Sequence, residues 1–418
     1  MKPILRKGLT LACLLGLGML STASDAAAPA RDPQGFLYGR ITTRSGTVYE
    51  GRLRWGQEEA FWGDFFNAAK KDLPYSEHIP REKRQHRESL EVFGVPLGIS
   101  WNEDNDGRQF AARFGDLRRI EAKNGGDEAT VVFKSGARSE VSGGSNDIEG
   151  GTEITVWDRG AGETRVEWRE VQSVQFLPTP ADLAVPVFRL RGTVHTEEGA
   201  FRGYIQWDQD ECLSDDELNG NAKDGKVSLR MGEIRSIERQ GRNSSKVVLR
   251  NGRTVVLDGT NDVDSSNRGI YVHDPRFGRV LISWDAFRRI DFDPPGGSGP
   301  AYADFQPGRP LYGKVSTMQG KTWRGRLVYD ADEADTMEFL DGRRNEIDYS
   351  IPFARIASIV PERPDASRVI YKDGQELKLE DTADVGRENA GMLVFEGGQK
   401  TPRYIAWEDV RRIDFEER

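Results

Sequence analysis

Three pairs of acidic residues recur at one spacing along the chain, and their side chains are the ones whose type and spacing could do chemistry. Each pair follows an aromatic residue, Trp55, Trp207 or Tyr329, with one acid four positions later and a second acid nine positions later. The pairs are Glu59 with Asp64, Glu211 with Asp216, and Glu333 with Glu338. We predict that these six residues line ligand-binding loops.

Paired carboxylates suit several roles, and the sequence leaves them open. Carboxylate oxygens are ligands for Ca²⁺, so each pair could hold a cation or a basic or polyhydroxylated partner. A carboxylate at a turn can instead serve structure by accepting hydrogen bonds from backbone N–H groups. Two carboxylates can also hydrolyse a glycoside, but that reaction needs one acid in a distinct environment, and the threefold pattern argues against a single active site.

Tryptophan offers a second kind of binding group. The chain has nine Trp residues, and five of them fall at positions that recur along the chain, where a buried indole is the ordinary expectation. The other four are candidates for stacking against a ligand: Trp62, Trp101, Trp157 and Trp323.

The residue types of conventional catalysis give no support to an enzyme. The four His residues form no His-x-x-x-His zinc pair, and no Gly-x-Ser-x-Gly elbow occurs. Cys212 stands among acidic neighbours, which disfavour the thiolate, and its role stays open. We assign no catalytic residue and no cofactor, with Ca²⁺ as the one metal that the acidic pairs could hold. A site assembled from distant positions remains an alternative.

An apolar motif indicates that the chain is a threefold internal repeat. A Trp followed by large apolar residues occurs as Trp168-x-x-Val171-x-x-Val174-x-Phe176, Trp284-x-x-Phe287-x-x-Ile290-x-Phe292 and Trp407-x-x-Val410-x-x-Ile413-x-Phe415. A shorter relative begins upstream of each, at Phe114, Met231 and Phe353. Spacing of three over so few positions suits a 3₁₀ turn that leads into a short strand.

Each half of a repeat opens with a hairpin pattern. Alternating β-branched residues run into Ser-Gly, Asn-Gly or Asp-Gly, as at Val131 to Gly136 and Val369 to Gly374. Each half of a repeat is short, close in length to the smallest sheets that can close into a barrel. The sequence therefore predicts an all-β chain of three tandem repeats, each of two small SH3-like or Sm-like β-barrel or half-sandwich units with a terminal 3₁₀ turn.

The first residues have the pattern of a secretory signal peptide. Lys2, Arg6 and Lys7 precede an apolar run from Leu9 to Leu20, and small residues follow near Ala26. We predict a signal peptide over residues 1–26, a secreted or periplasmic mature chain, and no transmembrane segment after cleavage.

Linkers rich in Pro and Gly divide the chain after the predicted signal peptide into three parts. The predicted repeat units span 35–177, with an insertion at 68–99 of unassigned role, then 188–293 and 309–416. The chain carries 59 Lys and Arg residues against 68 Asp and Glu residues, for a net charge of −9. A surface of that sign is not built to neutralise phosphate, so nucleic acid is excluded as an expected partner.

These observations favour a non-catalytic binding or scaffold module of a bacterial-type cell envelope. Three similar surfaces on one chain would multiply weak contacts to a repetitive protein or polysaccharide. The alternative is a hydrolase that acts on an envelope polysaccharide or peptide. The ligand and the oligomeric state are not specified by the sequence.

Overall fold

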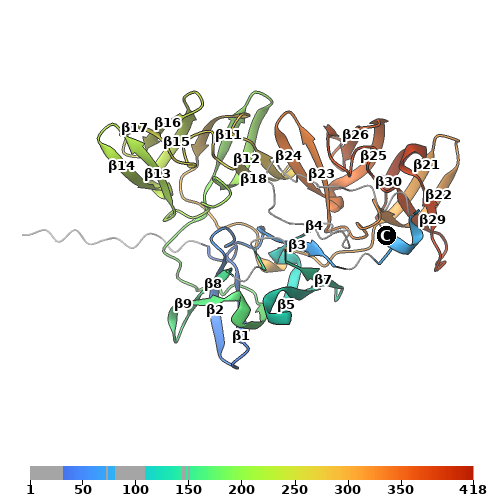
Figure 1. Cartoon of the computed structure of the whole chain (residues 1–418), viewed down its shortest axis with the longest axis horizontal. Helices are drawn as coiled ribbons and strands as arrows, with labels where there is room; N and C mark the ends of the chain where they lie inside the picture. Colours follow the sequence, from blue (N-terminus) through green and yellow to red (C-terminus); the bar gives the residue numbers. More distant parts are fainter. Residues whose placement is uncertain (1–31, 72–73, 81–108, 144–146, 149–150, 418) are drawn as a thin grey trace, which may run out of the picture. The chain divides into compact units, whose positions relative to one another are not determined.

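The computed structural model describes residues 32–71, 74–80, 109–143, 147–148 and 151–417. The predicted signal peptide, Trp101 and most of the 68–99 insertion lie outside these residues. The described residues all belong to one compact unit. Every long element in the described part is a β-strand, in one sheet of 10 strands and one of 20 strands, and the described strands pair antiparallel (Figure 1). The prediction of an all-β chain is confirmed.

The first sheet holds the strands of the N-terminal third, which we call the first strand group. Their order across the sheet is β4-β3-β7-β6-β5-β10-β1-β2-β8-β9. The bounds are β1 (Tyr38–Thr43), β2 (Val48–Trp55), β3 (Phe65–Lys70), β4 (Gln109–Arg113), β5 (Leu117–Lys123), β6 (Glu128–Phe133), β7 (Arg138–Ser142), β8 (Glu153–Asp158), β9 (Gly162–Glu167) and β10 (Val171–Phe176).

The second sheet begins with the second strand group, whose pairings run β14-β13-β17-β16-β15-β20-β11-β12-β18-β19. This order corresponds strand for strand to that of the first group. The bounds are β11 (Arg191–Thr196), β12 (Gly199–Gln206), β13 (Glu217–Ala222), β14 (Gly225–Arg230), β15 (Ile234–Arg239), β16 (Ser244–Leu249), β17 (Thr254–Asp258), β18 (Ile270–Asp274), β19 (Gly278–Ile282) and β20 (Phe287–Phe292).

The third strand group pairs in the corresponding order, β24-β23-β27-β26-β25-β30-β21-β22-β28-β29. Pairing of β19 with β24 joins it to the second group. The bounds are β21 (Tyr312–Thr317), β22 (Thr322–Tyr329), β23 (Phe339–Arg344), β24 (Ile347–Pro352), β25 (Ile356–Arg363), β26 (Ala366–Tyr371), β27 (Glu376–Glu380), β28 (Met392–Phe395), β29 (Arg403–Ile405) and β30 (Val410–Phe415).

Short 3₁₀ turns stand where the spacing of three predicts them, at five of the six motifs, and Trp284 begins an ordinary turn. Each of the five leads directly into a strand. They are η2 (Phe114–Asp116), η4 (Trp168–Glu170), η5 (Met231–Glu233), η7 (Phe353–Arg355) and η8 (Trp407–Asp409), and three further turns are η1 (Ser76–His78), η3 (Asn124–Gly126) and η6 (Tyr302–Asp304).

The predicted small barrels are wrong for the described strands, because both sheets are open. The hairpins of the two halves do not close on themselves. In the first group β10 pairs with β5 on one side and with β1 on the other, so the halves merge into one continuous sheet. The same merging occurs through β20 and β30.

A glycine in the second strand of each group allows close packing against its neighbour. A Cβ on Gly51, Gly203 or Gly325 would lie 2.1, 2.0 or 2.1 Å from a backbone oxygen of the paired strand. No side chain fits there, so the recurring Gly is required by the pairing of β2 with β8, β12 with β18, and β22 with β28.

The aromatic residue at the end of each of these strands, or directly after it, lies in the core. Trp55, Trp207 and Tyr329 are all 0% exposed.

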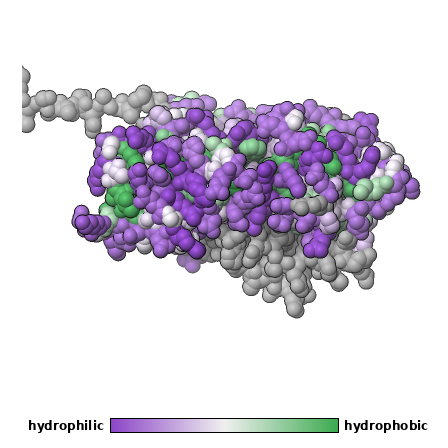
Figure 2. Space-filling view, turned by 90° about the horizontal axis from the view of Figure 1, so that it is seen from above, coloured by the Kyte–Doolittle hydropathy of each residue, from purple (hydrophilic) through white to green (hydrophobic). Residues whose placement is uncertain are grey.

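The view in Figure 2 shows a largely hydrophilic face with small, scattered apolar patches. Among the described residues, no helix is long and apolar enough to cross a membrane.

Candidate functional site

The first acid of each predicted pair sits in a tight loop after the buried aromatic residue. Backbone bridges join Trp55 to Glu59, Trp207 to Glu211 and Tyr329 to Glu333. These loops need left-handed backbone, which Gly56 supplies in the first loop, Asp208 and Gln209 in the second, and Asp330 and Ala331 in the third. The spacing of four therefore reflects a closed turn that returns each Glu to the aromatic strand.

The three glutamates are held away from solvent. One carboxyl oxygen of each, Oε2, is buried and has no hydrogen-bond partner among the described residues. Burial raises the pKa of Glu211 to about 9, with further contributions from Asp262 and Asp210. Burial likewise raises the pKa of Glu59 and of Glu333 well above the usual value. A pKa of about 9 makes Glu211 a neutral carboxyl at neutral pH, and burial favours the same form of Glu59 and Glu333.

A further acid, from the second half of each group, stands behind each of these loops. The carboxylates of Asp147, Asp262 and Asp384 accept backbone N–H bonds from the strand that follows the loop, at 2.6, 2.6 and 2.7 Å. Their carbonyl oxygens accept the side-chain hydrogen bonds of the buried aromatic residues. These residues fix the aromatic ring and the strand together.

The second acid of each predicted pair closes the loop as a turn cap. Oδ2 of Asp64 accepts the N–H groups of Ala60 and Phe61, both at 2.9 Å. Asp216 accepts those of Cys212 and Leu213, and Glu338 those of Ala334 and Asp335. One oxygen of each carboxylate thus satisfies two backbone donors, which is the structural role that the sequence left open.

The other oxygen of each capping acid bonds to a basic residue of a different strand group. Arg189 reaches Asp64 at 2.7 Å, and Arg54 reaches Asp216 at 2.8 Å. Lys70 of the first group reaches Glu338 of the third at 3.3 Å. The Arg189–Asp64 pair is the most buried, with side chains 3% and 4% exposed. The acidic pairs therefore lie at the joints between strand groups.

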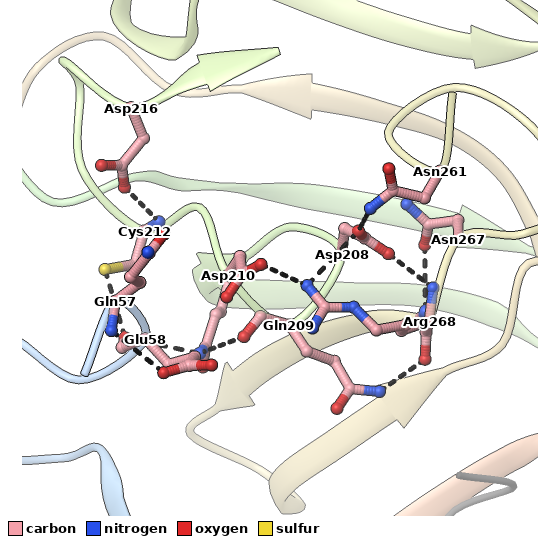
Figure 3. Close-up of polar contacts among 12 residues, drawn as sticks. Gln57, Glu58, Asp208, Gln209, Asp210, Cys212, Asp216, Asn261, Asn267 and Arg268 are labelled. Carbon is pink, nitrogen blue, oxygen red and sulfur yellow. Dashed lines mark hydrogen bonds and ion pairs between the residues drawn. The ribbon is translucent and has the colours of Figure 1, made fainter. Parts of the chain in front are cut away.

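Figure 3 shows the polar side chains at the joint between the first and second strand groups. Arg268 pairs with Asp208 and Asp210, and Glu58 lies beside Asp210. Burial raises the pKa of Glu58, and the charge of Asp210 raises it further. The Cys212 thiol lies 3.5 Å from the Glu58 carbonyl oxygen. Burial raises the pKa of this thiol well above its usual value, which disfavours the reactive thiolate.

One cluster in the described part of the chain has the ligand types and spacing for a metal ion. Carboxylate oxygens of Asp330, Asp332 and Glu333 lie within 4.8 Å of one another. The Lys70 ammonium lies among them, 3.0 Å from Asp332 and 3.8 Å from Glu333. The chain supplies its own cation there.

Replacing Lys70 with Met tests that assignment. Because its acidic neighbours would lose their cation, we expect the variant to lose about 1–3 kcal/mol of stability and to regain part of it with Ca²⁺. Thermal melts with and without CaCl₂ measure both effects. Lys71→Met, which removes the neighbouring exposed pair with Glu128, serves as the control and should cost less than about 1 kcal/mol. The same calcium response in wild type and in the Lys70 variant would contradict the assignment.

The tryptophans predicted to stack against a ligand differ in how exposed their rings are. Trp62 is 0% exposed and donates to Thr179 Oγ1 at 3.1 Å. Trp157 and Trp323 are half-buried, and Arg52 lies 3.5 Å above the Trp157 ring. Trp62 is therefore closed to a ligand in this structure, whereas the other two keep a partly open ring.

The fold and these contacts define an all-β protein of open antiparallel sheets, in which acidic loops bond to basic residues of other strand groups. Comparison of the chain with protein-family models, with curated proteins and with solved structures found no match.

Proposed function

We propose that this chain is a non-catalytic binding or scaffold protein of a bacterial-type cell envelope, exported by its first 26 residues and built of three tandem repeats of one ten-strand unit. The corresponding strand order of the three groups supports the repeat. Protein or polysaccharide of the envelope is the proposed partner.

The observation that supports the proposal is the set of contacts that the repeated acidic residues make. Asp64, Asp216 and Glu338 each satisfy backbone donors with one oxygen and a basic residue of another strand group with the other. Carboxylates held in this way link one strand group to another. A joined set of similar surfaces suits multivalent attachment, since tethering raises the effective concentration of each further contact.

The test is to express the tagged full chain in a Gram-negative bacterium, fractionate the cells and determine its N-terminus. We expect a chain that begins near Ala27, is found in the envelope fraction, and sediments with purified envelope without releasing labelled sugar or peptide. Retention in the cytosol with residues 1–26 attached would overturn the proposed location. Release of labelled fragments that is abolished by one of Glu59→Gln, Glu211→Gln or Glu333→Gln would favour a hydrolase.

A further inference from the structure

The third strand group contains a cavity of ≈ 300 Å³. Its floor includes Leu311, Phe353 and Ile356, and its edge includes Thr336 and Lys372. Lys372 pairs with Glu417 at 2.8 Å, and both side chains are exposed, so this ion pair can open at little cost.

The corresponding place in the first strand group is filled by the chain itself. Tyr302, from the linker before the third group, lies there, with its hydroxyl bonded to the Leu117 carbonyl at 2.6 Å and its ring 4.5 Å from that of Trp62. The Lys134 ammonium lies 3.4 Å from the centroid of the Tyr302 ring and also donates to the Phe305 carbonyl at 3.0 Å. Lys134 occupies the sequence position that corresponds to Lys372.

Linker aromatic rings cover the adjoining turn in the first two groups. A Cβ on Gly115 would lie 2.3 Å from the Phe305 ring, and a Cβ on Gly232 would lie 3.2 Å from the Phe188 ring. The third group has Ala354 at this position, and Ala354 is exposed. Its methyl group blocks a ring seated like Phe305, so the third site differs from the first in shape on this side.

On the other side, the third site has more room. Thr336 stands where the first group has Trp62, because each lies seven residues after the buried aromatic residue of its group. The smaller side chain leaves the cavity open beside Lys372. The site therefore retains the cation and the apolar floor that hold Tyr302 in the first group, and lacks the indole that fills the space there.

We propose that this cavity binds an aromatic side chain, Tyr or Phe, carried on a short turn of a partner protein, with the ring against Lys372 and a backbone carbonyl accepting from its ammonium group. The inference rests on the proposed binding function and assigns it a site. A cation above an aromatic ring and a donor to a peptide carbonyl are the contacts that Lys134 makes with the chain's own linker. Arg309, Arg326 and Lys372 line the cavity together with Glu416 and Glu417, and this small excess of positive charge favours an acidic residue in the same turn, as Asp304 is in the turn of Tyr302.

Titration of the full mature chain with a fluorescent peptide of this chain's own linker sequence, residues 298–308, tests the site. We expect saturable binding that is lost when the peptide's Tyr and Phe are both replaced by Ala, and about tenfold weaker binding to Lys372→Gln. Lys134→Gln is the matched control and should leave the peptide affinity unchanged.

Three results would overturn the inference. One is no binding at millimolar peptide. Another is loss of binding in Lys134→Gln but not in Lys372→Gln, which would mean that the peptide exchanges with the chain's own linker. The third is equal binding of the original peptide and of the peptide in which Tyr and Phe are both Ala. None of these bears on envelope location or on hydrolysis, so failure here is distinguishable from failure of the proposed function.

Discussion

Replacing Arg189 with Met is expected to lower the free energy of unfolding by about 3–5 kcal/mol, because the substitution leaves a buried carboxylate without its cation. Arg189 lies 2.7 Å from Asp64, and both side chains are almost fully buried. The guanidinium also packs over the rings of Phe61 and Tyr204, at 4.2 and 4.3 Å from their centroids. This is the most enclosed of the three joints, and urea denaturation followed by Trp fluorescence measures its effect.

The control for this prediction is two residues along the chain. Arg191 pairs with Asp293 at 3.7 Å, with side chains 48% and 22% exposed. Arg191→Met should therefore change stability by about 0–1 kcal/mol. Equal losses in the two variants would show that the Arg189 effect is not due to its buried pair, and the assignment of Asp64 as a joint would be abandoned.

The second large effect is a loss of stability as pH rises, which Glu211→Gln should reduce. The folded-state pKa of Glu211 is about 9, above its usual value of 4.5. At a pH between 4.5 and about 9 the unfolded chain releases this proton and the folded chain keeps it. The stability that the Glu211 carboxyl contributes is therefore fully present below pH 4.5 and is lost as the pH rises to about 9.

The magnitude follows from the linkage between proton binding and folding. From pH 6 to pH 8 the wild type should lose about 1–3 kcal/mol relative to Glu211→Gln, since one pKa unit corresponds to about 1.4 kcal/mol. Stability curves in urea at several pH values give this difference directly, and Glu217→Gln, an exposed acid on β13, is the control. A difference that is flat or of opposite sign would mean that Glu211 is charged in the folded protein.

Local pattern was enough to predict the strands and the buried rings. Alternation and hairpin glycines located all-β structure, and the recurring positions of Trp55 and Trp207 predicted their burial, because these signals depend on neighbours a few residues apart. Closure of the sheets was mispredicted. Whether β5 meets β10 depends on pairing between residues such as Ile120 and Val174, and no local pattern encodes that choice.

The candidate site was predictable only in part for the same reason. Spacing identified Asp64, Asp216 and Glu338 as related residues, and a turn-capping role was among the expectations. Their basic partners lie 125, 162 and 268 residues away along the chain. Those distances explain why Arg189, Arg54 and Lys70 carried no signal in the sequence, although they decide what the acids do.

The central claim is that the repeated acidic loops serve the chain's own structure, and one melting experiment tests it most directly. The mature chain and a variant with Glu59, Glu211 and Glu333 changed to Gln are heated at pH 8 with and without Ca²⁺. Because Gln resembles the neutral carboxyl that burial favours at all three sites, we predict a higher midpoint for the variant and no calcium response in either protein. A calcium-dependent rise in the wild-type midpoint that the variant loses would contradict the account and make the loops cation sites.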